Sequence, residues 1–512
     1  MNAPLFTGLL IALGSLFSCQ PAPEPVPERP NVLLIMVDDM GWSDLGCYGG
    51  EVQTPHLNRL AKEGMRFRQF YNNAKCTTTR FSLISGLYPR RDSSDSHMLR
   101  TNMMTLGEIM KLGGYQTSLS GKWHLGRDQV RHPFHRGFDR YYGLLDGCSN
   151  FFDPSQQDPP YKGNRIRYFG ENDTRITEFP DDFYATDAFT DHAIQAIEDY
   201  SQNEAPFFLH LCYTAPHYPI QALPEDIEKY IGTFDIGWEE MRKERYQRQV
   251  DMGLIDAERY PLSGFDSRAY PWEEANHEFE DLRMAVYAAM IDRVDQNIGR
   301  LLSTLEEQGE LDNTLILFLS DNGGCAEEPG GRDPAQRTPG PKEDYVAVGP
   351  AWGWAQNAPF RRYKVWMNEG GINTPMIAWW PGQVPADTIT DEVAHIMDVL
   401  PTFGELAEVA YPTAYQGQAI LPVDGTSMLS VLKGNSRVQP NQLCWEYAKN
   451  RAIRQGDWKL VWDKLNQQWE LYDLSQDRTE TQNLADQFPD RVENMAADWF
   501  VWADKHGLEV RP

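Results

Sequence analysis

Polar side chains able to hold a metal ion follow two strongly apolar segments of the chain. Asp38 and Asp39 come at the end of NVLLIMVDDMG, and Asp321 and Asn322 come at the end of NTLILFLSDNGG. Asp, Asn and Gly also form turns after strands, but their recurrence after two segments favours a site. Carboxylate and amide oxygens are hard ligands that suit Ca²⁺ or Mg²⁺ and disfavour zinc. The residue types therefore predict a site for a hard divalent cation.

One cysteine, Cys76, lies in the stretch NNAKCTTTRFSLISG, close to the start of a predicted helix. Amide groups and the helix dipole favour negative charge at such a position, so a catalytic nucleophile is expected there. A thiol, however, is a soft group and a poor partner for a hard cation. The mismatch indicates that Cys76 does not remain a cysteine.

The elements that must position these groups are short apolar runs alternating with helical patterns. A third apolar run, APFFLHLCYTAPHYP, leads to His217, and RMAVYAAMIDRVDQNIGRLLSTLEEQG has the apolar spacing of a long helix that ends at Gly309. This alternation predicts an α/β domain with a largely parallel sheet. Ligands of such sheets bind beyond the carboxyl ends of the strands, where the Asp, Asn and His side chains fall.

The pattern changes after about Asp424. NRAIRQGDWKLVWDKLNQQWELYDLSQD reads as short strands with turns at Gly456 and near Asn466, and PDRVENMAADWFVWADKHG reads as a final amphipathic helix. We therefore predict a catalytic domain over residues 31–435 and a subdomain over residues 436–512, built as a small antiparallel sheet with a helix.

Composition limits the partners of the protein. The 512 residues carry a formal net charge of -27, and no long basic run is available to follow a nucleic-acid backbone. Nucleic acid is therefore excluded as an expected partner. An anionic substrate requires Lys, Arg and His residues to be concentrated locally against this background.

The first thirty residues read as an export signal and a spacer. The apolar stretch from Leu5 to Phe17 fits a secretory signal, and LFSC, ending at Cys19, resembles a bacterial lipobox. Residues 1–19 are therefore predicted to be a signal peptide with a lipobox-like end, where Cys19 is lipidated after cleavage, and residues 20–30 a proline-rich tether in the cell envelope. The other six of the seven cysteines form no CxxC pair and no disulfide scaffold.

Several blocks together resemble the type I sulfatases, in their bacterial arylsulfatase-like branch. The blocks are CTTTRFSLISGLYPRR, NVLLIMVDDMGWSDLGCYGG, TPHLNRLAKEGMRF, SGKWHLG, LSDNGG, FRRYKVWMNEGGINTP, GDWKLVWD and WELYDLSQD, and they cover essentially the chain after the tether. The resemblance implies a large alkaline-phosphatase-like domain with a mixed, mostly parallel sheet between helices. It also implies that a formylglycine-generating enzyme oxidises Cys76 to formylglycine, whose hydrate attacks the sulfur of a sulfate ester.

The resemblance further assigns roles to individual residues. Arg80 orients the hydrate, Lys122 binds sulfate oxygens, and His124 helps to remove the proton that collapses the sulfated intermediate. His217 and Lys364 hold the sulfate and protonate the leaving oxygen. The ligands implied for Ca²⁺, rather than Mg²⁺, are Asp38, Asp39, Cys76, Asp321 and Asn322.

The residue patterns alone leave other interpretations open. Lys364 could be a solvated surface residue and His217 a turn residue, while Lys122 and His124, two apart, could point the same way from an extended segment. Trp352 and Trp354 could be core residues or a stacking surface for a sugar or aryl group.

The implied substrates are sulfated glycans, with aryl sulfates as surrogates. The family pattern generally has proline or alanine at the position of Thr78, and commonly arginine at the position of Asn373. One alternative function is phosphate or phosphonate ester hydrolysis on the same fold. Another is a non-catalytic envelope lipoprotein that binds sulfated glycans, for which Cys76 would stay unmodified.

Overall fold

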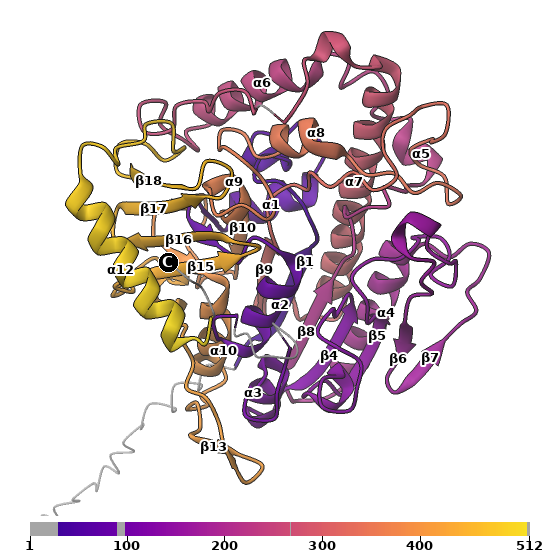
Figure 1. Ribbon diagram of the computed structural model, residues 1–512. Coiled ribbons are helices and arrows are strands. Elements are labelled where there is room, and N and C mark those ends of the chain that lie inside the picture. Colours follow the sequence, from indigo (N-terminus) through magenta and orange to yellow (C-terminus); the bar gives the residue numbers. More distant parts are fainter. Residues whose placement is uncertain (1–28, 90–97, 267, 509–512) are drawn as a thin grey trace, which may run out of the picture.

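The computed structural model describes residues 29–89, 98–266 and 268–508 (Figure 1). The predicted signal peptide and most of the tether lie outside these residues. A ten-stranded mixed sheet runs through the described part of the large domain. In spatial order its strands are β11 (Thr388–Thr390), β2 (Met65–Phe67), β10 (Met376–Trp379), β9 (Thr314–Ser320), β1 (Asn31–Val37), β8 (Phe207–Cys212), β4 (Gln116–Gly121), β5 (Arg140–Leu144), β6 (Phe169–Glu171) and β7 (Thr174–Ile176).

The centre of this sheet is parallel, as predicted. β1 pairs in parallel with β8 on one side and β9 on the other, and β4 continues the parallel order to β5. Antiparallel pairs occur toward the margins, where β10 joins β9 to β2 and where β6 joins β5 to β7. The uninterrupted apolar sequence of β1 is explained by its position, because all seven of its residues are buried.

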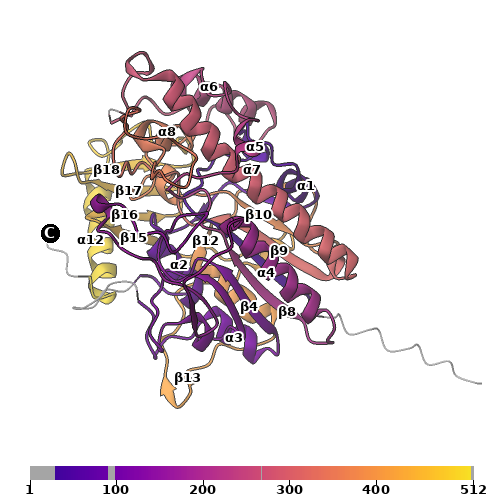
Figure 2. The same ribbon diagram turned by 90° about the vertical axis from the view of Figure 1, so that its right-hand side faces the viewer.

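Helices cover both faces of the sheet (Figures 1 and 2). Alternate residues of β1 enter two separate cores: Leu33 and Ile35 pack on one face, and Leu34 and Met36 pack on the other. The first core includes α1 (Pro55–Glu63), α4 (Ala185–Tyr200), α6 (Gly237–Asp251), α7 (His277–Glu307) and α8 (Gly349–Ala355). The second includes α2 (Cys76–Ser85), α3 (Leu106–Leu112), α10 (Val399–Leu406) and α11 (Leu429–Leu432).

Short elements complete the large domain. They are β3 (Phe70–Tyr71) with β12 (Ala394–His395), the hairpin of β13 (Ala414–Tyr415) and β14 (Gln418–Ala419), α5 (Pro224–Ile227) and α9 (Glu369–Ile372). Trp352 and Trp354 are only 0% and 3% exposed, so the core interpretation of these rings holds and the stacking interpretation is wrong.

The C-terminal sheet is antiparallel with one long helix against it, as predicted (Figure 1). Its strands are β15 (Leu443–Tyr447), β16 (Asn450–Gln455), β17 (Trp458–Asp463) and β18 (Gln468–Asp473), and the helix is α12 (Pro489–Lys505). Their shared core also contains Tyr71, Ala74 and Ile372 of the large domain. The C-terminal sheet therefore packs directly on the segments that flank Cys76 and follow Lys364. The boundary at residues 435 and 436 stays a prediction.

Candidate active site

The two acidic segments meet at the carboxyl edge of the sheet. Val37 and Ser320, the last residues of β1 and β9, are paired in register, so the residues that follow them are neighbours. The Asn322 amide donates a hydrogen bond to Asp39 Oδ1 at 2.7 Å, and the Asp39 backbone N–H donates to Asp321 Oδ1 at 3.2 Å. The predicted meeting of Asp39, Asp321 and Asn322 is confirmed.

Buried oxygen atoms in this cluster fit a metal cation. Asp38 Oδ1 and Asn322 Oδ1 are buried and have no hydrogen-bond partner among the described residues. Donor atoms of Asp38, Asp39 and His217 all lie within 4.8 Å of one another. Since a buried acceptor without a donor is costly, these hard oxygens suit a Ca²⁺ or Mg²⁺ ion. The structure thus brings His217 to the cluster, whereas the sequence placed this residue only at the end of a strand.

Asp321 has a basic partner of its own. The Arg80 guanidinium, on α2, lies 2.9 Å from Asp321 Oδ2 and donates another hydrogen bond to the Lys122 carbonyl at 2.9 Å. Both side chains of this ion pair are nearly inaccessible to solvent. Arg80 therefore connects the helix that begins at Cys76 with the end of β9 and with the segment after β4.

Lys122 and Lys364 lie inside the site, which makes the surface interpretation of Lys364 wrong. Lys122 forms an ion pair with Asp38, and Lys364 Nζ lies 2.7 Å from Asp39 Oδ2. These four side chains are at most 1% exposed. Together with Arg80, the two lysines bring three cationic groups to the site, and each of them is paired with a carboxylate.

The segment from Lys122 to His124 is not extended as expected. β4 ends at Gly121, and His124 adopts a φ of 61°, in the left-handed region. The spacing argument that placed both side chains on one strand face was therefore wrong. His124 Nδ1 is buried without a hydrogen-bond partner in the described part of the chain. Burial, together with Lys122, holds the pKa of His124 well below its ordinary value, so the ring is neutral at pH 7.

His217 presents a lone pair to the carboxylate cluster. Its Nδ1 lies 2.6 Å from the Tyr218 carbonyl and must donate there, so in the neutral ring Nε2 carries no proton. Nε2 lies 3.4 Å from Asp39 Oδ2. Burial lowers the pKa of His217 to about 4, although Asp39 opposes the shift. Two lone-pair atoms facing each other leave room for a cation or a proton between them.

Cys76 is the first residue of α2, as expected for a nucleophile at a helix N-terminus. The side chain is buried, and burial raises the pKa of its thiol even though Lys122, Lys364 and Lys75 favour the thiolate. A thiol with a raised pKa is protonated at neutral pH and is a weak nucleophile. As a thiol, Cys76 is therefore not activated for nucleophilic attack by these neighbours.

Two charged residues near the site were missed by the sequence interpretation. Lys75 immediately precedes Cys76, and its Nζ lies 2.7 Å from Glu327 Oε1. The Tyr218 hydroxyl donates to the other Glu327 oxygen. The position of Glu327, a few residues beyond Asp321 and Asn322, was the only sequence signal that could have found it.

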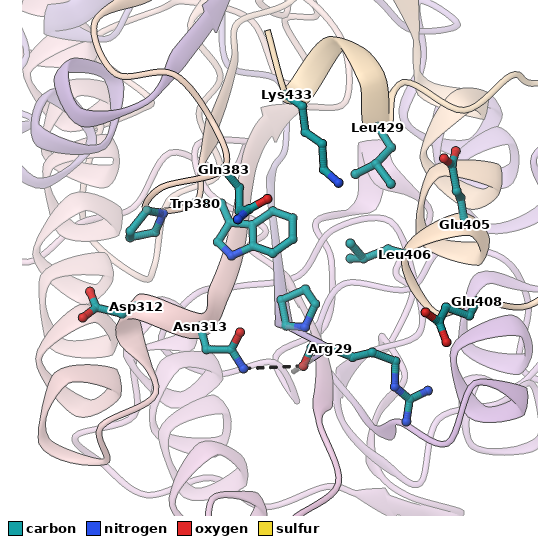
Figure 3. Close-up of a pocket in the computed structure, with 12 residues that line it drawn as sticks. Arg29, Asp312, Asn313, Trp380, Gln383, Glu405, Leu406, Glu408, Leu429 and Lys433 are labelled. Carbon is teal, nitrogen blue, oxygen red and sulfur yellow. Dashed lines mark hydrogen bonds between the residues drawn. The ribbon is translucent and has the colours of Figure 1, made fainter. Parts of the chain in front are cut away.

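A pocket at the opposite edge of the sheet has different chemistry (Figure 3). It has a volume of about 480 Å³ and lies where the chain enters β1 and β9, with Arg29, Asn313, Glu405 and Lys433 in its wall. Asn313 donates a hydrogen bond to the Arg29 carbonyl at 3.5 Å. The strands separate this pocket from Cys76 by about 20 Å, given a rise of roughly 3.3 Å per residue. Its lining contains none of the residues that the sequence singled out for catalysis or metal binding.

Two further properties concern the described residues as a whole. No disulfide joins their six cysteines, which are all buried. Within the same residues, every helix is too short or too polar to cross a membrane.

The fold and the site together define an α/β enzyme for an anionic ester. The sulfatase family model matches residues 30–409, and the model for the C-terminal region of N-sulphoglucosamine sulphohydrolase matches residues 360–497. The chain therefore belongs to the sulfatase family, and it is a sulfuric ester hydrolase.

Individual relatives agree with this assignment. The chain is 33% identical to an uncharacterized sulfatase of Schizosaccharomyces pombe, over 95% of both chains. It is 31% identical to an arylsulfatase of Klebsiella aerogenes, over 81% of this chain and 95% of the relative. Among solved structures, Ps i-CgsB in complex with k-i-k-neocarrahexaose is 26% identical, with a TM-score of 0.69 and 94% of each chain covered.

Proposed function

We propose that this protein hydrolyses sulfate esters of carbohydrates through a formylglycine hydrate derived from Cys76. The observation that carries the proposal is the environment of Cys76, a buried helix N-terminus surrounded by lysines and beside a carboxylate cluster with orphaned oxygen atoms. The lysines match an anionic sulfate group, and a hard cation held by the orphaned oxygens would favour an oxygen nucleophile over a soft thiol. The modifying partner is a formylglycine-generating enzyme.

Asp38, Asp39, Asp321 and Asn322 are proposed to hold Ca²⁺ together with modified Cys76. Bound Ca²⁺ would lower the pKa of an oxygen nucleophile and offset the negative charge of the sulfate group. The hard oxygen donors favour Ca²⁺ or Mg²⁺ over zinc, and the resemblance favours Ca²⁺. The unpaired oxygens of Asp38 and Asn322 support this assignment.

The cationic side chains are proposed to bind and orient the reacting groups. Lys122 and Lys364 would bind sulfate oxygens by charge-assisted hydrogen bonds, which requires each to share or exchange its present carboxylate partner. Arg80 would fix the orientation of the side chain at position 76, because its guanidinium is already held by Asp321 and the Lys122 carbonyl.

The two histidines are proposed to move protons. His124 is neutral at pH 7 and has an unpaired buried nitrogen, so it can accept the proton whose removal collapses the sulfated intermediate. His217, together with Lys364, would protonate the leaving oxygen; its unprotonated Nε2 must first take up a proton, and Asp39 stabilises that charged form. Asp321 would assist the first deprotonation of the nucleophile.

Sulfated glycans are the proposed natural substrates, with aryl sulfates as surrogates. The similar solved structure in complex with k-i-k-neocarrahexaose and the arylsulfatase relative support these two classes. We also propose that the protein is exported to the bacterial cell envelope, as the sequence of residues 1–30 indicates.

A comparison of matched esters tests the reaction class. We expect protein from the native host to hydrolyse p-nitrophenyl sulfate with a much higher kcat/KM than p-nitrophenyl phosphate or a phosphonate monoester. A large preference for the phosphorus esters would contradict the proposal and favour the alternative hydrolase. Glycan binding without turnover of any ester would favour the non-catalytic alternative.

A further inference from the structure

Glu327 is an acidic residue on the solvent-facing side of a site that is proposed to bind an anion. The side chain of Glu327 is 36% exposed, whereas that of Lys75 is 18% exposed and that of Lys364 is 1% exposed. Lys75 forms an ion pair with Glu327 at 2.7 Å, and the charge of Lys364, which pairs with Asp39 in the buried cluster, stabilises the Glu327 carboxylate. Glu327 is the outermost of the three.

Glu327 interacts with two residues that are adjacent in the sequence to site residues. Its Oε1 lies 2.7 Å from Nζ of Lys75, which precedes Cys76, and its Oε2 accepts a hydrogen bond from the hydroxyl of Tyr218, which follows His217. Burial alone would raise the pKa of Glu327, but Lys364 and Lys75 hold it well below its ordinary value. The group is therefore a carboxylate with a fixed orientation, held between the residue that precedes Cys76 and the residue that follows His217.

Aromatic rings extend from Glu327 toward the surface. Tyr218 packs against Tyr345 with 5.9 Å between ring centroids, and Tyr345 packs against Tyr161 at 6.3 Å. Tyr218 and Tyr345 are buried, at 6% and 8% exposed, so Tyr161, at 42% exposed, is the ring of the three that offers its surface to a ligand. Lys162 Nζ lies over the Tyr218 ring, 4.8 Å from its centroid, and donates to the Tyr218 hydroxyl at 3.2 Å.

This combination suits a sugar. The C–H face of a sugar ring packs on aromatic surface, and its hydroxyl groups donate to a carboxylate in strong, charge-assisted hydrogen bonds. A carboxylate can only accept such bonds, so it offers nothing to a second sulfate group and repels it. An aryl leaving group without hydroxyls would gain from the rings alone.

We propose that Glu327 is a specificity-determining residue, which accepts hydrogen bonds from the sugar hydroxyls beside the scissile ester and rejects a second sulfate group at that position. The inference rests on the proposed function, because it concerns the alcohol side of the same reaction. It predicts that the enzyme prefers sugars with free hydroxyl groups next to the sulfate ester over densely sulfated sugars.

The test compares Glu327→Gln with the native enzyme on three probes. The first probe is p-nitrophenyl sulfate. The second is galactose 4-sulfate or galactose 6-sulfate, whichever monosulfate the native enzyme prefers, and the third is galactose 4,6-disulfate. We expect Glu327→Gln to lower kcat/KM for the monosulfate at least about 10-fold, because a site that recognises a substrate hydroxyl depends on the hydrogen bond to that hydroxyl. The value for p-nitrophenyl sulfate should change less than about 3-fold, and the ratio of disulfate to monosulfate turnover should rise about 10-fold.

A matched control is Glu328→Gln, one residue along the chain. Glu328 likewise forms an ion pair, with Arg283 at 3.1 Å, so the control loses an ion pair from the same segment without changing a residue assigned to the site. It should leave the ratios among the three probes unchanged.

Three results would overturn the inference. Equal losses on all probes would make Glu327 a positioning residue for Lys75 and Tyr218, and unchanged ratios would remove it from recognition altogether. Turnover of p-nitrophenyl sulfate but of neither monosulfated sugar by the native enzyme would show that hydroxyls are not recognised. Failure of the proposed function would give a different result from these three. In that case, native protein with an aldehyde at position 76 would hydrolyse no sulfate ester.

Discussion

Glu369 and Lys459, ninety residues apart in the sequence, form an ion pair of 2.7 Å in which both side chains are completely buried. Arg478 donates to the other Glu369 oxygen at 2.6 Å, and the Tyr71 hydroxyl donates to the same oxygen at 2.9 Å. Lys459 also pairs with Glu480 at 2.8 Å. Burial opposes ionisation of Glu369, but Arg478 and Lys459 hold its pKa below the ordinary value.

This network connects the C-terminal sheet to the segments on which the site is built. Glu369 begins α9, whose Gly371 carbonyl accepts from Gly323 N–H at 3.3 Å, directly after Asn322. Tyr71 ends β3, and the chain from there reaches Cys76 within five residues. We therefore expect Lys459→Met to reduce stability by about 3–5 kcal/mol, as for removal of one partner of a buried ion pair. Urea denaturation measures this loss.

The same substitution should reduce kcat of the folded variant about 10-fold or more, because small misplacements of reacting groups are costly. Arg136→Met is a matched control, since Arg136 pairs with Glu108 at 2.9 Å and both are nearly buried, but neither adjoins Cys76 or its partners. It should reduce stability similarly and leave kcat near the native value. Equal effects of both variants on kcat would show that the network only supports folding.

Metal removal should affect both activity and stability. Asp38, Asp39 and Asp321 are buried together, and a chelator would leave their charges to repel one another. We expect chelation to reduce activity at least about 100-fold and to lower the Tm, with Ca²⁺ restoring both. Calorimetry and p-nitrophenyl sulfate turnover measure the two effects.

Asp38→Asn should raise the Ca²⁺ concentration needed for that rescue, because Asp38 supplies an unpaired buried oxygen. Asp387→Asn, at an exposed ion pair with Lys62, is the control and should need the native concentration. An unchanged Tm and activity in the presence of chelator would exclude a required divalent ion.

Acid should destabilise the protein through His395. Its Nδ1 accepts a hydrogen bond from Met397 N–H at 3.2 Å, and burial lowers its pKa from the ordinary 6.5 to about 3. Below pH 6.5 the unfolded chain takes up a proton that the folded chain does not, so stability is lost as pH falls from 6.5 toward 3. The loss is about 1.4 kcal/mol per pH unit from this group.

His395→Asn removes the titrating group while offering a side-chain oxygen to Met397 N–H. Between pH 6.5 and pH 5 the variant should lose about 2 kcal/mol less stability than the native protein. Urea denaturation at both values measures the difference, and the two proteins should behave alike between pH 7 and pH 8. Identical losses in acid would contradict the expected role of His395.

The sequence predicted the structure correctly where a single local pattern was sufficient to determine the element. The apolar runs before Asp38 and Asp321 predicted two buried strands, because strands covered on both faces need continuous apolar sequence. The turns at Gly456 and near Asn466 likewise predicted the C-terminal hairpins. The adjacency of these two strands, which brings the acidic residues together, is given by the structure.

Contacts between distant segments had no such local signal. The pairing of Glu369 with Lys459 depends on how a second sheet packs on the first, and only the inward position of a lysine in WKLVWD hints at it. The left-handed conformation of His124 interrupts what periodicity treated as an extended segment. The interaction between Lys364 and Glu327 likewise arises from tertiary packing.

Peptide mass spectrometry across Cys76, on protein made by the native host, tests the central claim most directly. We expect a tryptic peptide that carries an aldehyde, or its hydrate, at position 76, and sulfatase activity that scales with the fraction converted. Active protein in which only the thiol is found at that position would contradict it.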